Sequence, residues 1–372
     1  MNSRFAFFIV LCALSAVSCY AGEQEIQEAA AAIEGAFGVI QRDGSGKITA
    51  VDLAADRASA DDNVFKKTLQ LPQLKSLRVA GGTITPQTFA MLKEQTALTD
   101  LYLKEITVND ADLNAALTPL TQLKRLTLRR LPNVTAIPKL PNLRNLSLLE
   151  LSFTEKTFFS LLENKLLTAL DLRGCSGLTE ENYQSLKTFE KLTDLKIGGF
   201  AVNDETLKAV TPLPNLTGLT LDDTCITPES LAAYIADSPS AQTLHTLVIN
   251  KGTLLDDDLF VLNQLQKLNR LTLSDMMITG TVLVQWAQGG TVRPKLKILS
   301  LKKTLLTEEG AAALKKFGEL QTLDLSYTNV TPPAAAVVVT LPNLKTLYLT
   351  GCGLDEAAEN VLKGNNTIKV VR

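Results

Sequence analysis

The feature that most constrains this chain is a short leucine motif that recurs along most of its length. The motif reads Leu-x-x-Leu-x-Leu, and its successive copies begin 20 to 28 residues apart. Repetition at such a period is typical of solenoid proteins, in which each repeat buries its apolar face against its neighbours. The twelve copies begin at Leu74, Leu98, Leu123, Leu143, Leu167, Leu192, Leu216, Leu244, Leu268, Leu296, Leu320 and Leu344.

Each copy predicts a strand followed by a helix. In one of the last copies, Leu323 and Leu325 alternate with Asp324, so the leucines of a short strand point inward and Asp324 points outward. Thr331 is a favourable helix N-cap, and Pro332 suits the first helical position. We therefore expect an α/β solenoid: a curved, right-handed β/α superhelix with a parallel sheet on its concave face and helices on its convex face.

The repeats resemble those of the leucine-rich-repeat superfamily, over residues 48–372. Their ending, Leu-x-x-Thr-x-Ile/Val-Thr, is similar to that of exported bacterial members close to the cysteine-containing and ribonuclease-inhibitor-like subclasses. Cys175 and Cys352 stand where that subclass carries Cys, Thr or Asn. The resemblance implies a module that binds a protein or another ligand, and it implies no shared catalytic activity.

The first 21 residues have the layout of a secretory signal peptide. Arg4 precedes an apolar run from Phe5 to Val17, which is too short to span a bilayer as a helix. We expect cleavage after Ala21 and export to a periplasm, the cell surface or the extracellular space. An alternative is a lipoprotein with a lipid anchor at Cys19, because the segment 16–19 resembles a lipobox.

The patterns divide the chain into three parts. We expect a signal peptide over residues 1–21, an N-terminal helical cap and hairpin over 22–47, and a solenoid of 12–13 repeats over 48–372. The Ala-rich segment from Glu23 to Phe37 has a helical pattern, as an element that covers the open end of the stack requires.

Three copies depart from the regular repeat. Between Leu123 and Leu143 the copy shrinks and contains prolines, so we expect an extended connection in place of a helix. Two other copies carry four additional residues, in Ala236 to Thr243 and in Gln288 to Pro294. These insertions are either part of a recognition surface or loops whose length is simply tolerated.

Composition argues against several classes of function. The formal net charge of −2 gives no general attraction to nucleic acid, and no segment beyond the N-terminus is apolar for long enough to cross a membrane. The cysteines outside the signal segment are Cys175, Cys225 and Cys352. Their odd number and wide separation argue against a disulfide framework, so we interpret them as buried thiols.

Catalytic and metal-binding residues are scarce, and we expect no enzyme activity, no metal and no cofactor. His245 is the only histidine, and no Ser or Cys is placed to form a nucleophilic pair with it. Asp171 and Asp194 fall in adjacent repeats, where carboxylates about 5–9 Å apart would suit a glycan hydrolase. Lys196 lies beside Asp171 in the next strand, however, so an ion pair explains these residues better.

The segment from Gln41 to Asp52 resembles an EF-hand calcium loop, with Phe37 and Ile40 placed as in the preceding helix. Gln41 is a poor ligand at the first position, and Asp52 stands where a bidentate Glu is usual. The alternative interpretation is a Gly-rich hairpin turn that leads into the first strand of the solenoid.

The concave face is the predicted binding surface. The residue between the last two leucines of each motif forms a nearly all-polar row along it, suited to a protein, peptide or glycan ligand. The N-terminal half of this face is basic, with only Asp100 and Asp171 to oppose the cations, which suggests an acidic partner. The basic residues are Lys104, Arg125, Arg129, Arg130 and Arg173. The candidate ligand-binding residues are Tyr102, Lys104, Arg125, Arg129, Arg173, Lys196 and Tyr348.

The leading hypothesis is thus a non-catalytic exported binding module. An envelope or surface scaffold that acts by self-association is the second hypothesis, and a glycan hydrolase that uses Asp171 and Asp194 is the third.

Overall fold

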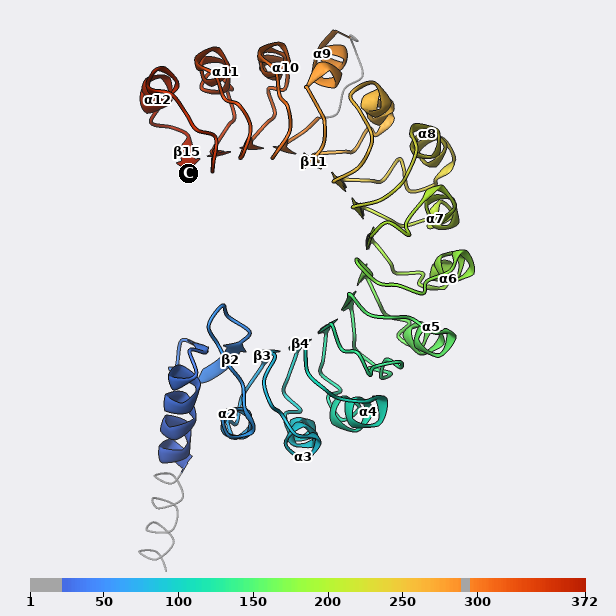
Figure 1. Cartoon of the computed structure of the whole chain (residues 1–372), viewed down its shortest axis with the longest axis vertical. Coiled ribbons are helices and arrows are strands. Elements are labelled where there is room, and N and C mark those ends of the chain that lie inside the picture. The colour runs from blue at the N-terminus through green and yellow to red at the C-terminus, as the bar shows by residue number, and fades with distance from the viewer. Residues whose placement is uncertain (1–21, 289–294) are drawn as a thin grey trace, which may run out of the picture. The chain divides into compact units, whose positions relative to one another are not determined.

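The computed structural model describes residues 22–288 and 295–372, in which short strands and helices alternate along the chain (Figure 1). These residues form two compact units: unit 1 extends to Leu166, and unit 2 begins at Leu167. The predicted signal peptide, the lipid site at Cys19 and the insertion segment 289–294 lie outside the described residues.

Unit 1 begins with a helix over residues 22–35 and an antiparallel hairpin, after which every strand is parallel to the one before it. Its strands are β1 (Val39–Arg42), β2 (Ile48–Leu53), β3 (Ser76–Ala80), β4 (Asp100–Lys104), β5 (Arg125–Arg129) and β6 (Asn145–Leu149). Its other helices are α2 (Asp62–Thr68), α3 (Pro86–Phe89), the 3-10 helix η1 (Ala90–Glu94), α4 (Asp110–Leu117) and α5 (Glu155–Leu162).

Unit 2 contains parallel strands that pair in chain order. These are β7 (Ala169–Asp171), β8 (Asp194–Gly198), β9 (Gly218–Asp222), β10 (Thr246–Asn250), β11 (Arg270–Ser274), β12 (Ile298–Ser300), β13 (Thr322–Asp324), β14 (Thr346–Tyr348) and β15 (Lys369–Val371). The α-helices are α6 (Glu180–Ser185), α7 (Asp204–Val210), α8 (Pro228–Asp237), α9 (Thr281–Gln288), α10 (Glu308–Ala313), α11 (Pro332–Val338) and α12 (Glu356–Lys363). The 3-10 helices are η2 (Leu186–Thr188), η3 (Asp257–Gln264) and η4 (Leu314–Lys316).

The leucines of the motif form the core, as the alternation predicts. Leu74, Leu77 and Val79 in unit 1, like Leu320 and Leu323 in unit 2, are fully buried between the strands and the helices. Within each unit the helices lie on one side of the strands (Figure 1). The fold is therefore the predicted α/β leucine-rich-repeat solenoid.

The strand register confirms the predicted polar row within each unit. The residues between the motif leucines pair with one another from strand to strand, and they lie on the face of the sheet that carries no helices. In unit 1 the row is Asp52, Arg78, Tyr102, Thr127 and Ser147. In unit 2 it is Asp171, Lys196, Thr220, Val248, Thr272, Ser300, Asp324, Tyr348 and Val371.

Threonine N-caps begin several of the helices. The hydroxyl oxygens of Thr85, Thr227 and Thr331 accept hydrogen bonds from the backbone N–H three residues later, and a proline follows each of them. This geometry satisfies a backbone donor that would otherwise lack a partner at the helix start. The Thr-Pro signal in the sequence thus predicts these helix starts correctly.

The short copy after β5 is extended, as its prolines predict, and side chains from neighbouring repeats satisfy its backbone. The Asp110 carboxylate accepts from the N–H groups of Thr135 and Ala136 at 2.6 and 2.8 Å. The buried amide of Asn164 accepts from Leu140 N at 2.9 Å and donates to Pro138 O at 3.2 Å. An extended segment can therefore replace a helix here without leaving these donors unpaired.

Two residues after the last motif leucine of each strand, the backbone turns in a left-handed conformation. This position is glycine in some repeats and a charged residue or Tyr in others. The non-glycine residues have φ of 51–61° and are Glu105, Arg130, Glu150, Asp223, Lys251, Asp275, Lys303 and Tyr327. Several of their N–H groups donate to the next repeat, as Lys251 N does to Ser274 O at 3.0 Å. We call these positions the left-handed row.

The calcium-loop interpretation is wrong, because the segment is a β-hairpin. Gln41 lies in β1 and Asp52 in β2, and Asp52 pairs with Val39 across the hairpin. The Asp43 carboxylate accepts from Ser45 N and Ser45 Oγ at 2.9 and 2.7 Å, which closes the turn. The hydroxyl of Ser45, above all, lowers the pKa of Asp43. The preceding helix ends at residue 35, so Phe37 and Ile40 are not helical.

The interpretation of the cysteines as buried thiols is also wrong. Cys225 is exposed, and Cys175 and Cys352 are half-buried. All three follow a strand, on the loop that carries the chain from the sheet towards the helix, where alternate side chains face solvent. Burial is therefore decided by the position in the loop rather than by the residue type.

Candidate functional site

The strand face, defined as the helix-free face of the sheet in each unit, carries the candidate binding residues. In unit 1, Tyr102 lies between two arginines. The guanidinium carbon of Arg78 is 4.1 Å from the centre of the Tyr102 ring, in a cation–π contact. Arg78 Nε also donates to the Asp52 carboxylate at 3.0 Å. On the other side, Arg129 lies on β5 two residues beyond Thr127, which is the register partner of Tyr102.

The basic residues of unit 1 are neutralised more completely than the sequence suggests. Arg129 pairs with Glu150 at 2.6 Å, and Arg130 pairs with Glu105 at 2.9 Å and also with Glu150. Lys104 is 3.6 Å from Glu105. The hydrogen bond that Arg129 donates to Glu150 raises the pKa of Arg129, against the opposing effect of partial burial.

The expectation that only Asp100 and Asp171 oppose these cations is therefore wrong. Asp100 does pair with Arg125, but Glu105 and Glu150 contribute as well. Both glutamates occupy the left-handed row, and this turn brings their carboxylates to the strand ends. The surface is a mixed network of charges rather than a basic patch.

Unit 2 carries a second charged cluster around Asp171. Arg173 binds both carboxylate oxygens of Asp171, with Nε at 3.0 Å from Oδ1 and Nη2 at 2.8 Å from Oδ2. Its Nη1 donates to Asp222 at 3.2 Å. Lys196 lies beside Asp171 in the register of β7 and β8. Burial raises the pKa of Asp194, and the nearby charge of Lys196 opposes this shift.

This arrangement commits Asp171 to an ion pair. A guanidinium that binds both oxygens of a carboxylate holds that carboxylate in place. The Asp171 carboxylate also accepts from the backbone N–H of Arg173 at 3.2 Å. The geometry thus places Asp171 in an ion pair whose partner is Arg173.

A groove of about 450 Å³ hollows the strand face of unit 2 at the ends of β9 to β13. Its lining is polar and carries charges of both signs. The hydroxyls of Ser274 and Ser300 are 3.3 Å apart, and Ser300 Oγ donates to the Asp324 carboxylate at 3.3 Å. The lining residues are Asp222, Asn250, Lys251, Thr272, Ser274, Asp275, Ser300, Lys302, Lys303 and Asp324.

The structure brings only some of the predicted site residues together. Tyr102, Lys104, Arg125 and Arg129 lie on adjacent strands of unit 1. Arg173 and Lys196 lie in or beside adjacent strands of unit 2, whereas Tyr348 lies in β14. None of the seven lines the groove.

The groove lysines are the residues that sequence reasoning missed. Lys251, Lys302 and Lys303 follow the motif directly, one or two places after its last apolar residue. A signal for this row exists in the sequence, since glycine recurs at the same place in other repeats, at Gly81 and Gly351, for example. Recurrent glycine at one position of a repeat indicates a left-handed turn.

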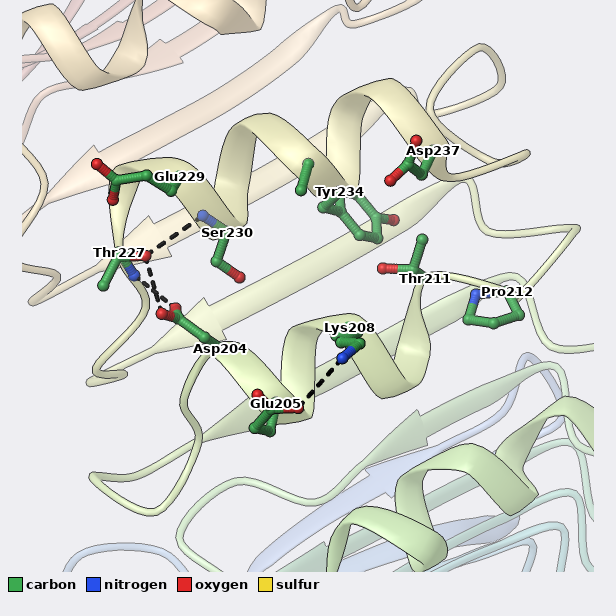
Figure 2. Close-up of a pocket in the computed structure, with 11 residues that line it drawn as sticks. Asp204, Glu205, Lys208, Thr211, Pro212, Thr227, Glu229, Ser230, Tyr234 and Asp237 are labelled. Carbon is green, nitrogen blue, oxygen red and sulfur yellow. Dashed lines mark hydrogen bonds and ion pairs between the residues drawn. The ribbon is translucent and has the colours of Figure 1, made fainter.

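A second hollow, of about 460 Å³, lies on the helix side of unit 2, between α7 and α8 (Figure 2). Figure 2 shows Asp204 at the start of α7 directed at Thr227, whose N–H and hydroxyl donate to its carboxylate at 2.7 and 2.8 Å. Glu205 and Lys208 pair along α7 at 3.7 Å. The polar groups at this end of the hollow thus join neighbouring repeats, which makes it a weaker candidate than the groove.

Metal and membrane sites are not found among the described residues. In residues 22–288 and 295–372, no group of three His, Cys, Asp or Glu side chains is placed to hold a metal ion. Within the same ranges, every helix is too short or too polar to span a bilayer. The His245 ring donates from Nδ1 to Thr243 O at 2.6 Å.

Comparisons with solved structures return leucine-rich-repeat proteins. An internalin from Listeria monocytogenes is 19% identical, with 87% of this chain and 86% of that chain covered and a TM-score of 0.44. A leucine-rich-repeat protein from Leptospira interrogans is also 19% identical, with 82% and 92% covered and a TM-score of 0.41. No family model matches the sequence, and no curated protein matches it.

Proposed function

We propose that this chain is a non-catalytic, exported binding module that holds a protein, peptide or glycan ligand on its strand face. The observation that carries the proposal is the polar groove of unit 2. Successive repeats contribute equivalent positions to its lining, so hydroxyl, amide, carboxylate and ammonium groups converge on one surface. Convergent polar groups in a concave site fix the orientation of a bound ligand and provide specificity.

A charged cluster on the strand face of each unit supports the proposal. Arg173 is fixed by Asp171 and Asp222, and Arg129 is fixed by Glu150. Side chains held in place lose little conformational entropy on binding, which favours affinity. We retain Tyr102, Lys104, Arg125 and Arg129 as candidate contacts on the strand face of unit 1, and Arg173, Lys196 and Tyr348 as candidate contacts on that of unit 2.

Export is proposed from the N-terminal sequence. The pattern over residues 1–21 is that of a signal peptide, whose cleavage after Ala21 would release the chain to a periplasm, the cell surface or the exterior.

The repeat subclass is a separate proposal. The helices of several repeats, such as α8 and α12, favour the ribonuclease-inhibitor-like subclass.

The test uses the purified chain against an immobilised glycan array and a displayed library of random peptides. Ser300→Trp places a bulky side chain in the groove, and Ser230→Trp is the matched control, because it makes the same change in the helix-side hollow. We expect a saturable ligand that binds the parent chain and Ser230→Trp but not Ser300→Trp. Equal binding to Ser300→Trp would place the site elsewhere and contradict the proposal.

A further inference from the structure

We propose that unit 2 binds an extended segment of a partner protein along the edge where β10, β11 and β12 end. The segment's apolar side chains pack on Leu255, Met277 and Leu305, and its carboxylates pair with Lys251 and Lys302. This inference rests on the proposed function, and it names the partner class and the part of the surface that recognises it.

An apolar ridge borders the groove. Leu255, Met277 and Leu305 are 53%, 64% and 54% exposed, although they are large and apolar. They come from three consecutive repeats. Met277 and Leu305 occupy the same position, four residues after the last motif leucine, and Leu255 lies two residues later in its own repeat. Exposed apolar side chains that align from repeat to repeat mark an interaction surface.

Backbone hydrogen bonds hold these loops side by side. Leu305 N donates to Ile278 O at 2.8 Å, which joins the loops that carry Leu305 and Met277. Thr279 N donates to the Asp256 carboxylate at 2.7 Å, which joins the loops that carry Met277 and Leu255. These bonds connect the loops of three successive repeats, which together carry the ridge.

The lysines of the groove set the charge of the partner. Asp222 is engaged by Arg173, and Lys303 lies 3.5 Å from Asp275. Among the described residues, neither Lys251 nor Lys302 makes an ion pair within 4.0 Å, and both line the groove. Their charge is complementary to carboxylates, which ammonium groups bind in charge-assisted hydrogen bonds.

Lys251 occupies a backbone position that disfavours it. Its φ of 51° is in the left-handed region, which a non-glycine residue adopts at a cost in stability. Glycine stands at this position in other repeats. A lysine in place of glycine costs stability without a compensating ion pair, as is expected of a side chain kept for recognition.

The ridge favours a polypeptide over a glycan. Sugars stack on open aromatic faces, whereas the three side chains of the ridge are aliphatic. Flexible Leu and Met side chains instead suit apolar residues of an extended peptide, whose alternate side chains point the same way.

The experiment measures binding of short synthetic peptides by fluorescence polarisation. Each probe carries two leucines at alternate positions, flanked by Asp and Glu, and the reference probe replaces the acids by Asn and Gln. We expect saturable binding of the acidic probe and at least tenfold weaker binding of the reference. Lys251→Gly should weaken the acidic probe about tenfold, the loss of one charge-assisted contact, and Met277→Ser should weaken both probes.

The variants are chosen so that the fold survives. Glycine is favoured at a left-handed φ, and Met277 is exposed, so neither change should unfold the chain. Asp223→Gly is the matched control. It makes the same change in the neighbouring repeat, at φ 61° and with the opposite charge, and it should leave binding unchanged or tighter.

Equal binding of the acidic and the reference probe would overturn the inference. Unchanged binding of the acidic probe to Lys251→Gly would overturn it too. A glycan that is lost in Ser300→Trp, with no binding of the acidic probe, would also overturn it while leaving the proposed function intact. Ligands that all bind Ser300→Trp normally would defeat the proposed function as well.

Discussion

The carboxylate of Asp256 accepts hydrogen bonds from both the backbone N–H and the hydroxyl of Thr279, at 2.7 and 2.8 Å. Asp256 precedes the helix of one repeat, and Thr279 lies in the loop of the next. The same relationship joins Asp204 to Thr227 and Asp110 to Thr135. These bonds fix each repeat to its neighbour on the side of the helix starts.

Loss of the Asp256 carboxylate should therefore be costly. It also accepts from Gly280 N and Val282 N at 3.0 and 3.1 Å, so Asp256→Ala leaves several buried donors without a partner. We expect a loss of about 3 kcal/mol in the free energy of unfolding, measured by urea denaturation. Asp237→Ala, at an exposed position of α8, is the control and should change stability little.

The buried carboxyl group of Asp194 should make the stability of the folded protein depend on pH. Burial raises its pKa above the ordinary value of 3.8, so the folded state favours the protonated form. The resulting stabilisation is present below the ordinary pKa and is lost as pH rises through the raised pKa. Asp194→Asn should therefore raise the melting temperature at about pH 7, and the gain should vanish at about pH 3. An equal gain at both values would contradict the burial of this charge.

Glu150 masks positive charge in unit 1. It pairs with Arg129 and Arg130, so Glu150→Gln should free Arg129 and leave Arg130 paired with Glu105 alone. We expect elution from a heparin column at higher salt than the parent chain, with a stability loss below about 1 kcal/mol. Glu94→Gln makes the same change in net charge on an exposed helix end, and it should shift elution less. Equal shifts would mean that net charge alone is responsible.

A side chain at Gly82 would clash with the backbone of a neighbouring loop, whereas one at Gly81 would not. A Cβ at Gly82 would lie 1.7 Å from the backbone oxygen of Ala60, whereas one at Gly81 meets nothing within 4 Å. Both residues have positive φ. Gly81→Ala should thus cost about 1 kcal/mol of conformational strain, and Gly82→Ala should cost clearly more in thermal or urea unfolding. Similar losses would show that the loop at Ala60 can move aside.

The polar row shows how much of the site the sequence predicts. Residues such as Arg78 and Tyr102 are placed correctly, because strand alternation and repeat spacing fix their face. The roles of Glu105 and Glu150 are not predicted. A left-handed turn directs their carboxylates back to the strand ends, and one sequence does not reveal the φ of a charged residue.

The sequence by itself determined the repeat, the buried leucines, the strand register and the Thr-Pro helix starts. Each depends on spacing along the chain and on local backbone chemistry. Only the tertiary structure decided which charges pair, where the groove opens and that Cys225 is exposed. Those features depend on how loops of neighbouring repeats meet in space, which residue spacing within a single repeat does not specify.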